Sequence, residues 1–235
     1  MDVQKGVDQL MNAVNVLILL LIALIYVVTG TRVGDNAIAA LSSGTVYRGA
    51  QNGRVALECT VSWDAEAVTD MLDVLKARDE QMTFFVSGRW AKTHASTLRR
   101  MTEEGHEVGT CGYAPLLDGG VGMVMQDVSA SAGVIQGITG GTVTCYHSGM
   151  RDRTVSARAA GRLGLTHVSA SCDLLCGRGG AEDILSRASG QLFDGSILLL
   201  QPTAAAAEAL DALLTDIREA GFEPATVGEA LKGTA

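Results

Sequence analysis

The 235-residue chain is poor in aromatic residues and has no excess of positive charge. Aromatic side chains make up 4% of the sequence, which argues against a long platform of rings for stacking on a sugar polymer. With 26 acidic and 18 basic residues, the formal net charge is -8, and a surface of that sign repels phosphate polymers. Nucleic acid is therefore not an expected partner.

The sequence also lacks the cysteine spacing of a disulfide framework. Its 5 cysteines are an odd number without a CxxC pair, which leaves room for two bridges at most. Free cysteines usually behave as small buried apolar side chains, and we expect that role for most of these. They are Cys59, Cys111, Cys145, Cys172 and Cys176.

The hydrophobic pattern indicates one globular domain with an N-terminal appendage, because no break divides it into two halves. Residues 10–29 carry no charge and approach the roughly 20 residues of a bilayer-spanning helix. We expect a short tail at residues 1–9 and an uncleaved transmembrane anchor at residues 10–30. A cleaved signal peptide is the alternative, since residues 16–28 have the length of a signal-peptide core.

Beyond the anchor, residues 31–54 are expected to form a stalk, because residues 36–54 are rich in Gly, Ser and Ala with little periodicity. Residues 55–235 are expected to form the folded domain. Short apolar runs typical of buried strands alternate there with segments whose apolar residues recur at helical spacing. This alternation predicts a mostly parallel sheet with covering helices, and a site at the carboxyl ends of the strands.

The expected strands lie at residues 55–61, 81–87, 107–110, 142–146, 167–170 and 195–201, and residues 223–227 lead into a short terminal helix. The other expected helices lie at residues 65–78, 95–104, 123–137, 153–163, 181–189 and 204–220.

Three segments carry a family resemblance. They are VALECTVSWDAEAVTDMLDVLKARDEQMTFFVSGRWA from Val55, TEEGHEVGTCGYAP from Thr102 and DGSILLLQPT from Asp194. In this order they resemble the first, second and last motifs of the polysaccharide deacetylase family (NodB homology, carbohydrate esterase 4-like). The sequence from Val61 to Trp63, after VYRG at Val46, is similar to the sporulation-associated bacterial branch. The resemblance implies a distorted (β/α) barrel of about seven parallel strands.

Members of that family remove acetyl groups from N-acetylated sugars with a metal-bound water. Such chemistry requires an open site with three protein ligands, a carboxylate base and a proton donor for the leaving amine. By resemblance, the paired aspartates of the first motif fall here on Thr60 and Val61. The two metal-binding histidines of the second motif fall on Cys111 and Pro115.

The remaining motifs are also altered. The arginine that orients the base falls on Cys145, and the closing histidine that donates the proton falls on Gln201. Ala170 replaces an aromatic residue, whereas Asp173 matches the aspartate of the family. We therefore assign no catalytic residue, no metal and no cofactor. The residues expected at a ligand site are Thr60, Trp63, Cys111, Tyr113, His147, Asp173 and Gln201.

Other sites stay open at this stage. The cysteines with His147 and Asp173 offer the ligand types of a rebuilt soft-metal site, and two of the thiols offer a disulfide. A thiol beside His147 offers a nucleophilic pair. His106, inside the GHEVG segment, is expected to be a hydrogen-bonded framework residue.

The favoured hypothesis is a single-pass protein of the cell membrane with its domain on the outer face. It is expected to be a catalytically inactive pseudoenzyme that binds an envelope glycan, such as peptidoglycan, or a protein partner. One alternative is an active carbohydrate N-deacetylase with a rebuilt site. Another is a structural component of a membrane assembly.

Overall fold

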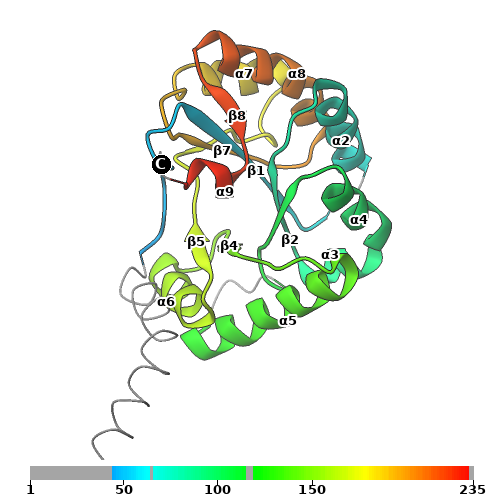
Figure 1. Ribbon diagram of the computed structural model, residues 1–235, viewed down its shortest axis with the longest axis vertical. Helices are drawn as coiled ribbons and strands as arrows, with labels where there is room; N and C mark the ends of the chain where they lie inside the picture. Colours follow the sequence, from blue (N-terminus) through cyan, green and yellow to red (C-terminus); the bar gives the residue numbers. More distant parts are fainter. Residues whose placement is uncertain (1–43, 64–65, 115–118, 233–235) are drawn as a thin grey trace, which may run out of the picture. The chain divides into compact units, whose positions relative to one another are not determined.

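The computed structural model describes residues 44–63, 66–114 and 119–232, which form a curled parallel sheet with helices around its outer face (Figure 1). The predicted anchor at residues 10–30 lies outside these residues. Within the described part of the chain, no helix is both long and apolar enough to cross a membrane.

Eight strands make up the sheet within the described ranges. They are β1 (Arg54–Val61), β2 (Thr83–Val86), β3 (Glu107–Thr110), β4 (Cys145–His147), β5 (Thr166–Val168), β6 (Cys172–Asp173), β7 (Ile197–Leu200) and β8 (Glu223–Ala225). Their order is β5-β4-β3-β2-β1-β7-β6, with β8 also paired to β1, and every pairing is parallel. The predicted parallel sheet with covering helices is confirmed.

The central strand β1 separates two layers of the core. Successive side chains of a strand point to opposite faces. The odd-numbered residues from Val55 to Val61 pack in the larger outer core, under the helices. On the opposite, concave face, Ala56 belongs to a smaller core with residues such as Phe85 and Ile197. The even-numbered residues Glu58 and Thr60 therefore face the interior of the barrel.

The helices that follow the strands are α2 (Glu66–Arg78), α3 (Gly88–Thr93), α4 (Ala95–Glu103), α5 (Val121–Thr139), α6 (Arg153–Leu163), α7 (Ala181–Ser189), α8 (Ala204–Glu219) and α9 (Val227–Ala230). In α2, Val68, Met71, Leu72 and Leu75 have the spacing of one helix face, and all four are buried. Helix α8 begins where the Thr203 hydroxyl accepts the Ala206 N–H. Helix α3 and strand β6 were not predicted from the sequence.

Residues 45–50, which we call the closing segment, connect β5 with the turn before β7. Val46 donates its N–H to His167 O of β5 and accepts the Ser169 N–H (both 2.9 Å). At its other end, Gly49 donates its N–H to Gly195 O (2.7 Å). These residues belong to the predicted stalk, and the structure places them against the barrel.

Helix α9 covers the end of the barrel at which the strands begin. Val227 donates its N–H to the Thr83 hydroxyl (2.8 Å), and Gly228 donates its N–H to the Glu107 carboxylate (2.8 Å). The Thr83 hydroxyl in turn donates to the same carboxylate (2.6 Å). In Figure 1, α9 lies within the ring of strands. The opposite end of the barrel, where the strands end, is the one available for a ligand.

The closing segment can be tested at Gly195, which has a φ of +81°. A Cβ there would lie 2.7 Å from Gly49 O and 2.9 Å from Ala50 O. We expect Gly195→Ala to lower the free energy of unfolding by about 1–3 kcal/mol more than Gly221→Ala. Urea denaturation of both variants measures this difference.

Gly221 is the matched control, because its φ is +87° but a Cβ there meets no atom within 4 Å. Both substitutions carry the same backbone penalty, so their difference isolates the contact with the closing segment. Equal losses would contradict this contact.

Candidate functional site

A cleft of about 660 Å³ lies where the strands end. The residues around it follow or terminate six of the strands, as expected for a parallel sheet. They are Thr60, Ser62, Trp63, Cys111, His147, Ser148, Gly149, Met150, Arg151, Arg153, Ser169, Ala170, Asp173, Leu199 and Gln201.

Six of the predicted ligand-site residues line this cleft, and one does not. The six are Thr60, Trp63, Cys111, His147, Asp173 and Gln201. Tyr113 lies elsewhere, with the Lys92 ammonium 5.2 Å from its ring centre and the ring packed closely over Gly88. A role of these residues in binding stays a prediction.

The rim of the cleft has two large exposed apolar side chains. Trp63, after β1, is 57% exposed, and Met150, after β4, is 85% exposed. An aromatic ring that water reaches on one side suits the apolar face of a sugar or of another flat ligand. Met150 was not identified from the sequence, because a loop residue carries no periodic signal.

Asp173 and Gln201 form a hydrogen-bonded pair on one wall. The Gln201 amide donates to Asp173 Oδ1 (2.9 Å), which also accepts the Leu175 N–H (2.8 Å). Gln201 Oε1 accepts the Cys176 N–H (2.9 Å), which fixes the direction of the amide. The pair therefore presents an exposed, oriented carboxylate to the cleft.

The loops after β3 and β4 are held together by a buried ion pair. The Arg151 guanidinium lies 2.6 Å from the Asp127 carboxylate of α5 and donates to the Tyr146 hydroxyl (3.1 Å). Asp127 also accepts the N–H groups of Tyr113 and Ala114 (3.0 Å each). These contacts fix one side of the cleft. Sequence reasoning missed them, because they join residues far apart in the chain.

Glu58 lies beneath the cleft and was also missed. Its side chain is fully buried, and neither carboxyl oxygen has a hydrogen-bond partner among the described residues. Burial, together with the nearby carboxylates of Asp173 and Glu107, raises its pKa to about 8. Glu58 is therefore mostly protonated at neutral pH. The sequence signal that could have identified Glu58 is a carboxylate between the apolar residues Leu57 and Cys59 of the central strand.

His147 lies beside Glu58, with 3.5 Å between its Nε2 and Glu58 Oε1. Its Nδ1 accepts the Gly149 N–H (3.1 Å), so the ring proton is on Nε2 and points toward Glu58. Burial lowers the pKa of His147 to about 4. Both side chains are thus uncharged near pH 7; His147 lines the cleft, and Glu58 is buried next to it.

The cysteines near the cleft are poor nucleophiles. Burial raises the pKa of the Cys111 thiol to about 11 and that of Cys145 to about 12. Cys111 lies 3.5 Å from the Ser62 hydroxyl, and Cys145 donates to the Glu107 carboxylate (3.8 Å). The cysteine–histidine pair considered from the sequence is not formed. All five cysteines are free thiols, so the disulfide alternative was wrong.

The residues present do not fit the metal that the family resemblance implies. Of the aligned ligand positions, Val61 packs in the outer core and Cys111 is a neutral thiol, while Pro115 lies outside the described residues. In the ranges that the structure describes, no three His, Cys, Asp or Glu side chains are grouped as a metal site requires. The rebuilt soft-metal site is therefore not supported there.

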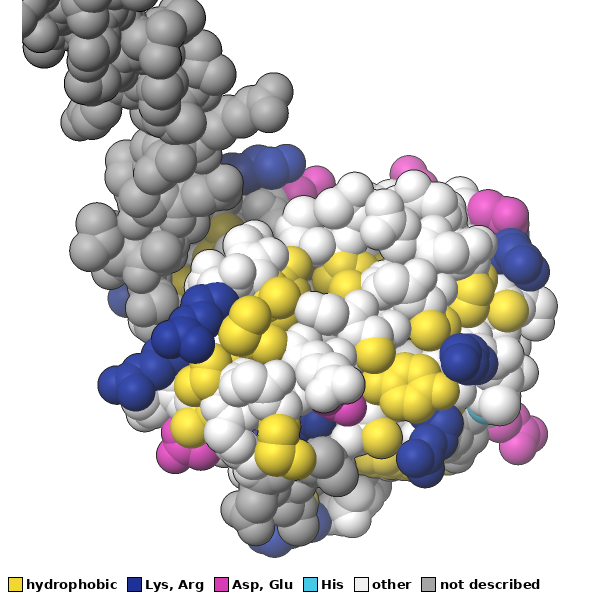
Figure 2. All heavy atoms as spheres, turned by 90° about the horizontal axis from the view of Figure 1, so that it is seen from below, with side chains coloured by type: hydrophobic (Ala, Val, Ile, Leu, Met, Phe, Trp, Pro, Cys, Tyr) yellow, Lys and Arg dark blue, Asp and Glu magenta, His cyan; other side chains and the backbone are white. Residues whose placement is uncertain are grey.

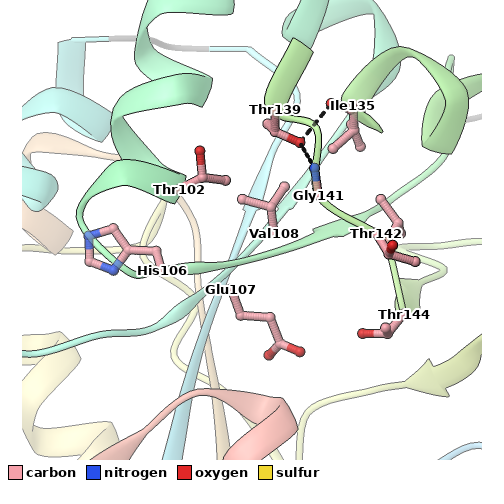
Figure 3. A pocket seen from close by; sticks show the side chains of 10 residues that line it. Thr102, His106, Glu107, Val108, Ile135, Thr139, Gly141, Thr142 and Thr144 are labelled. Carbon is pink, nitrogen blue, oxygen red and sulfur yellow. Dashed lines mark hydrogen bonds between the residues drawn. The ribbon is translucent and has the colours of Figure 1, made fainter. Parts of the chain in front are cut away.

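A second, smaller hollow of about 220 Å³ lies near the start of β3, between α4 and the loop before β4 (Figure 3). His106 lines it and accepts the Met82 N–H on Nδ1 (3.4 Å). Burial lowers its pKa to about 4. The His106 side chain has the framework role expected from the sequence.

The hydroxyl of Thr139, which also lines this hollow, donates to Ile135 O and accepts the Gly141 N–H (Figure 3).

Sequence comparison relates the chain to known proteins. The family model for polysaccharide deacetylase matches residues 54–168. The uncharacterized protein YlxY of Bacillus subtilis is 24% identical over 202 residues, which cover 83% of this chain and 63% of that protein. The chain thus spans less than two thirds of the length of this relative.

Structural comparison finds the same fold in several solved proteins. A CE4 family pseudoenzyme from Bacillus anthracis has a TM-score of 0.77 and 25% identity, covering 83% of this chain and 71% of that one. A mutant of that pseudoenzyme with restored enzymatic activity has the same TM-score at 24% identity, with 83% and 74% covered. PdaA of Bacillus subtilis, a family 4 carbohydrate esterase, has a TM-score of 0.73 at 21% identity, covering 83% and 88%.

The burial of Glu58 predicts a pH-dependent stability. Its carboxyl has a pKa of about 8 in the folded chain and an ordinary value of 4.5, so the folded state keeps a proton that the unfolded state releases. Stability therefore falls as the pH rises through this window. We expect Glu58→Gln to flatten the decline between pH 6.5 and 8, which is about 1.4 kcal/mol per pH unit for one proton. Urea midpoints across this range measure it.

Glu208→Gln is the control, because Glu208 is exposed on α8. Below pH 6.5 the histidines change the stability in the opposite direction. His106, His147 and His167 each have a pKa lowered to about 4, so their contribution is lost as the pH falls from 6.5 to 4. An unchanged slope above pH 6.5 in Glu58→Gln would show that Glu58 is already ionised in the folded chain.

Proposed function

Because the chain belongs to the polysaccharide deacetylase family, we propose that it is a pseudoenzyme that binds a glycan in its cleft without hydrolysing it. One observation carries the proposal. The cleft persists at the carboxyl ends of the strands, but the aligned base, metal-ligand and acid positions hold residues that cannot perform those roles.

The chemistry of each replacement supports this proposal. Thr60 stands where the family has a carboxylate, and a hydroxyl neither carries the negative charge that a metal attracts nor accepts a proton near pH 7. Gln201 stands where the family has the proton-donating histidine, and an amide does not titrate. Cys111, a histidine position, has a thiol pKa of about 11. Loss of one role would weaken catalysis, whereas these losses together remove base, ligand and acid.

The features that remain are those of a binding site. Trp63 offers an apolar ring at the rim, and the Asp173–Gln201 pair offers fixed acceptors for sugar hydroxyls. His147, which lines the cleft, and Glu58, buried next to it, are uncharged near pH 7. We propose an envelope glycan of the peptidoglycan type as the ligand, held by a domain on the outer face of the cell membrane. Residues 10–30 are proposed as its anchor.

A specific observation favours one alternative, an active N-deacetylase with a rebuilt site. Asp173 is retained at the aspartate position of the family and faces the cleft, with the Glu58–His147 pair below it. The two candidates differ in what purified protein does to an acetylated substrate. A role in a membrane assembly through residues 10–30 stays a further prediction.

We expect the purified chain to release no acetate from chitooligosaccharides or peptidoglycan fragments, with or without added Zn²⁺, and to contain much less than one metal ion per chain. Acetate assays and elemental analysis measure both. Stoichiometric metal together with acetate release would overturn the pseudoenzyme proposal. In that case Cys111→Ser and Asp173→Asn should each abolish turnover, as a rebuilt site requires.

Binding should depend on the cleft. We expect Trp63→Ala to weaken binding of an N-acetylglucosamine oligomer about fivefold, through loss of ring stacking. Asp173→Asn should weaken it about tenfold, because a charged acceptor becomes neutral while the side-chain shape is kept. Isothermal titration calorimetry measures both. Met123→Ala is the control, since this exposed side chain does not line the cleft. Equal affinities in all variants would place binding elsewhere.

A further inference from the structure

Helix α6 is a basic surface on a protein of net charge -8. It carries Arg153, Arg158 and Arg162, all exposed, and contains no acidic residue. Asp152, just before the helix, caps it by accepting the Val155 N–H. Within the described ranges, none of the three guanidinium groups forms an ion pair with a carboxylate. Their charges are therefore available to an external anion.

Helix α5, which packs beside α6, has an almost uncharged surface. Asp127 is its only charged residue, and that carboxylate turns inward to Arg151 and to backbone N–H groups. The outward positions are Gly, Ala, Ser and Gln, with Met123 55% exposed. Figure 2 views this side, where uncharged and hydrophobic surface fills the centre and Lys and Arg side chains stand at the margins.

The opposite side of the domain is different in charge. Helix α8 carries Glu208, Asp211, Asp216 and Glu219 against Arg218; Asp211 is paired with Arg78, and Arg218 with Glu80, so the other three acidic residues keep this side negative. A negatively charged surface would repel this side and attract the side of α5 and α6. The distribution of charge therefore favours one orientation of the domain over a planar anionic surface.

The chain enters the domain next to α6. Val46 pairs with Val168 of β5, and the Tyr47 ring lies 5.8 Å from the guanidinium of Arg153. Only residues 31–43 separate the proposed anchor from the described domain. A chain segment of that length spans at most roughly 50 Å when fully extended. Helix α6 is therefore beside the point at which the chain enters the described domain.

From these features we propose that the α5–α6 face, formed by helices α5 and α6, lies against an anionic lipid surface. Arg158 and Arg162, which lie on one face of α6, contact the lipid phosphates, and the uncharged surface of α5 with Met123 rests at the headgroup level. Lipid is favoured over a soluble polyanion, because an uncharged apolar helix beside the arginines suits a bilayer interface and adds nothing to binding a hydrated polymer. The proposal rests on the proposed anchor at residues 10–30.

This orientation leaves the cleft accessible. Helices α5 and α6 lie on the flank of the barrel (Figure 1), whereas the cleft is at the end where the strands terminate. Arg153 lies where the cleft and α6 meet, since it lines the cleft and is the first residue of α6. A glycan entering the cleft of a lipid-bound domain would therefore pass along the membrane surface.

The test uses the full chain in nanodiscs of phosphatidylcholine, with or without phosphatidylglycerol, that contain brominated lipids as quenchers. A fluorophore is attached at Met123→Cys or, as the control on α8, at Glu208→Cys, both in a Cys172→Ser background. We expect several-fold stronger quenching at position 123 than at position 208, and only with phosphatidylglycerol. The double variant Arg158→Gln with Arg162→Gln should lower the ratio of domains that contact the lipid to domains that do not, roughly fivefold for each arginine removed.

The matched control for the charge change is Arg99→Gln with Arg178→Gln, which removes two exposed arginines elsewhere and should leave the quenching unchanged. Equal quenching at positions 123 and 208 would overturn the proposed orientation. If dextran sulfate covers the fluorophore at position 123 in neutral nanodiscs, a soluble polyanion and not lipid is the ligand of the α5–α6 face. Failure to insert into either nanodisc would overturn the anchor itself, while glycan binding in the cleft would remain measurable in solution.

Discussion

The parallel pairing of β1 with three other strands is the constraint on which the rest of the structure depends. Because β1 is central, its odd-numbered residues must be apolar to pack under the helices, and its even-numbered residues determine what fills the barrel. Glu58 and Thr60 are among the latter. The same strand thus stabilises the fold through one face and sets the polarity of the cleft through the other.

The two faces of β1 have separate roles. The outer core is made of apolar contacts that do not depend on what faces the cleft. Thr60 on the inner face is not part of that core, whereas Val61, the other position aligned with the paired aspartates, belongs to it. The buried, protonated Glu58 shows that the interior still holds an ionisable group in a neutral state, with His147 as its neighbour.

Much of the fold could be predicted from the sequence, because β1 and β7 are short apolar runs typical of buried strands, and the helical spacing of apolar residues in α2 and α8 indicates which face is buried. The cleft could be predicted in part, since the family resemblance placed Thr60, Cys111 and Gln201 at motif positions near the carboxyl ends of strands, and these ends meet in a parallel sheet. Tyr113 was expected there but packs over α3, an element too short to have a periodic signal. The Arg151–Asp127 pair depends on the packing of α5 beside the loop after β4, which no local pattern encodes.

The closing segment has a mechanical consequence. It is joined to β5 and to the turn before β7 by backbone hydrogen bonds near its two ends, and it is the part of the domain through which the chain continues toward its N terminus. Tension applied along the chain from that side would therefore load the bonds of Val46 and Gly49 before it reached any central strand. Those few bonds would yield first and loosen one wall of the barrel, while β1 and its neighbours stayed paired.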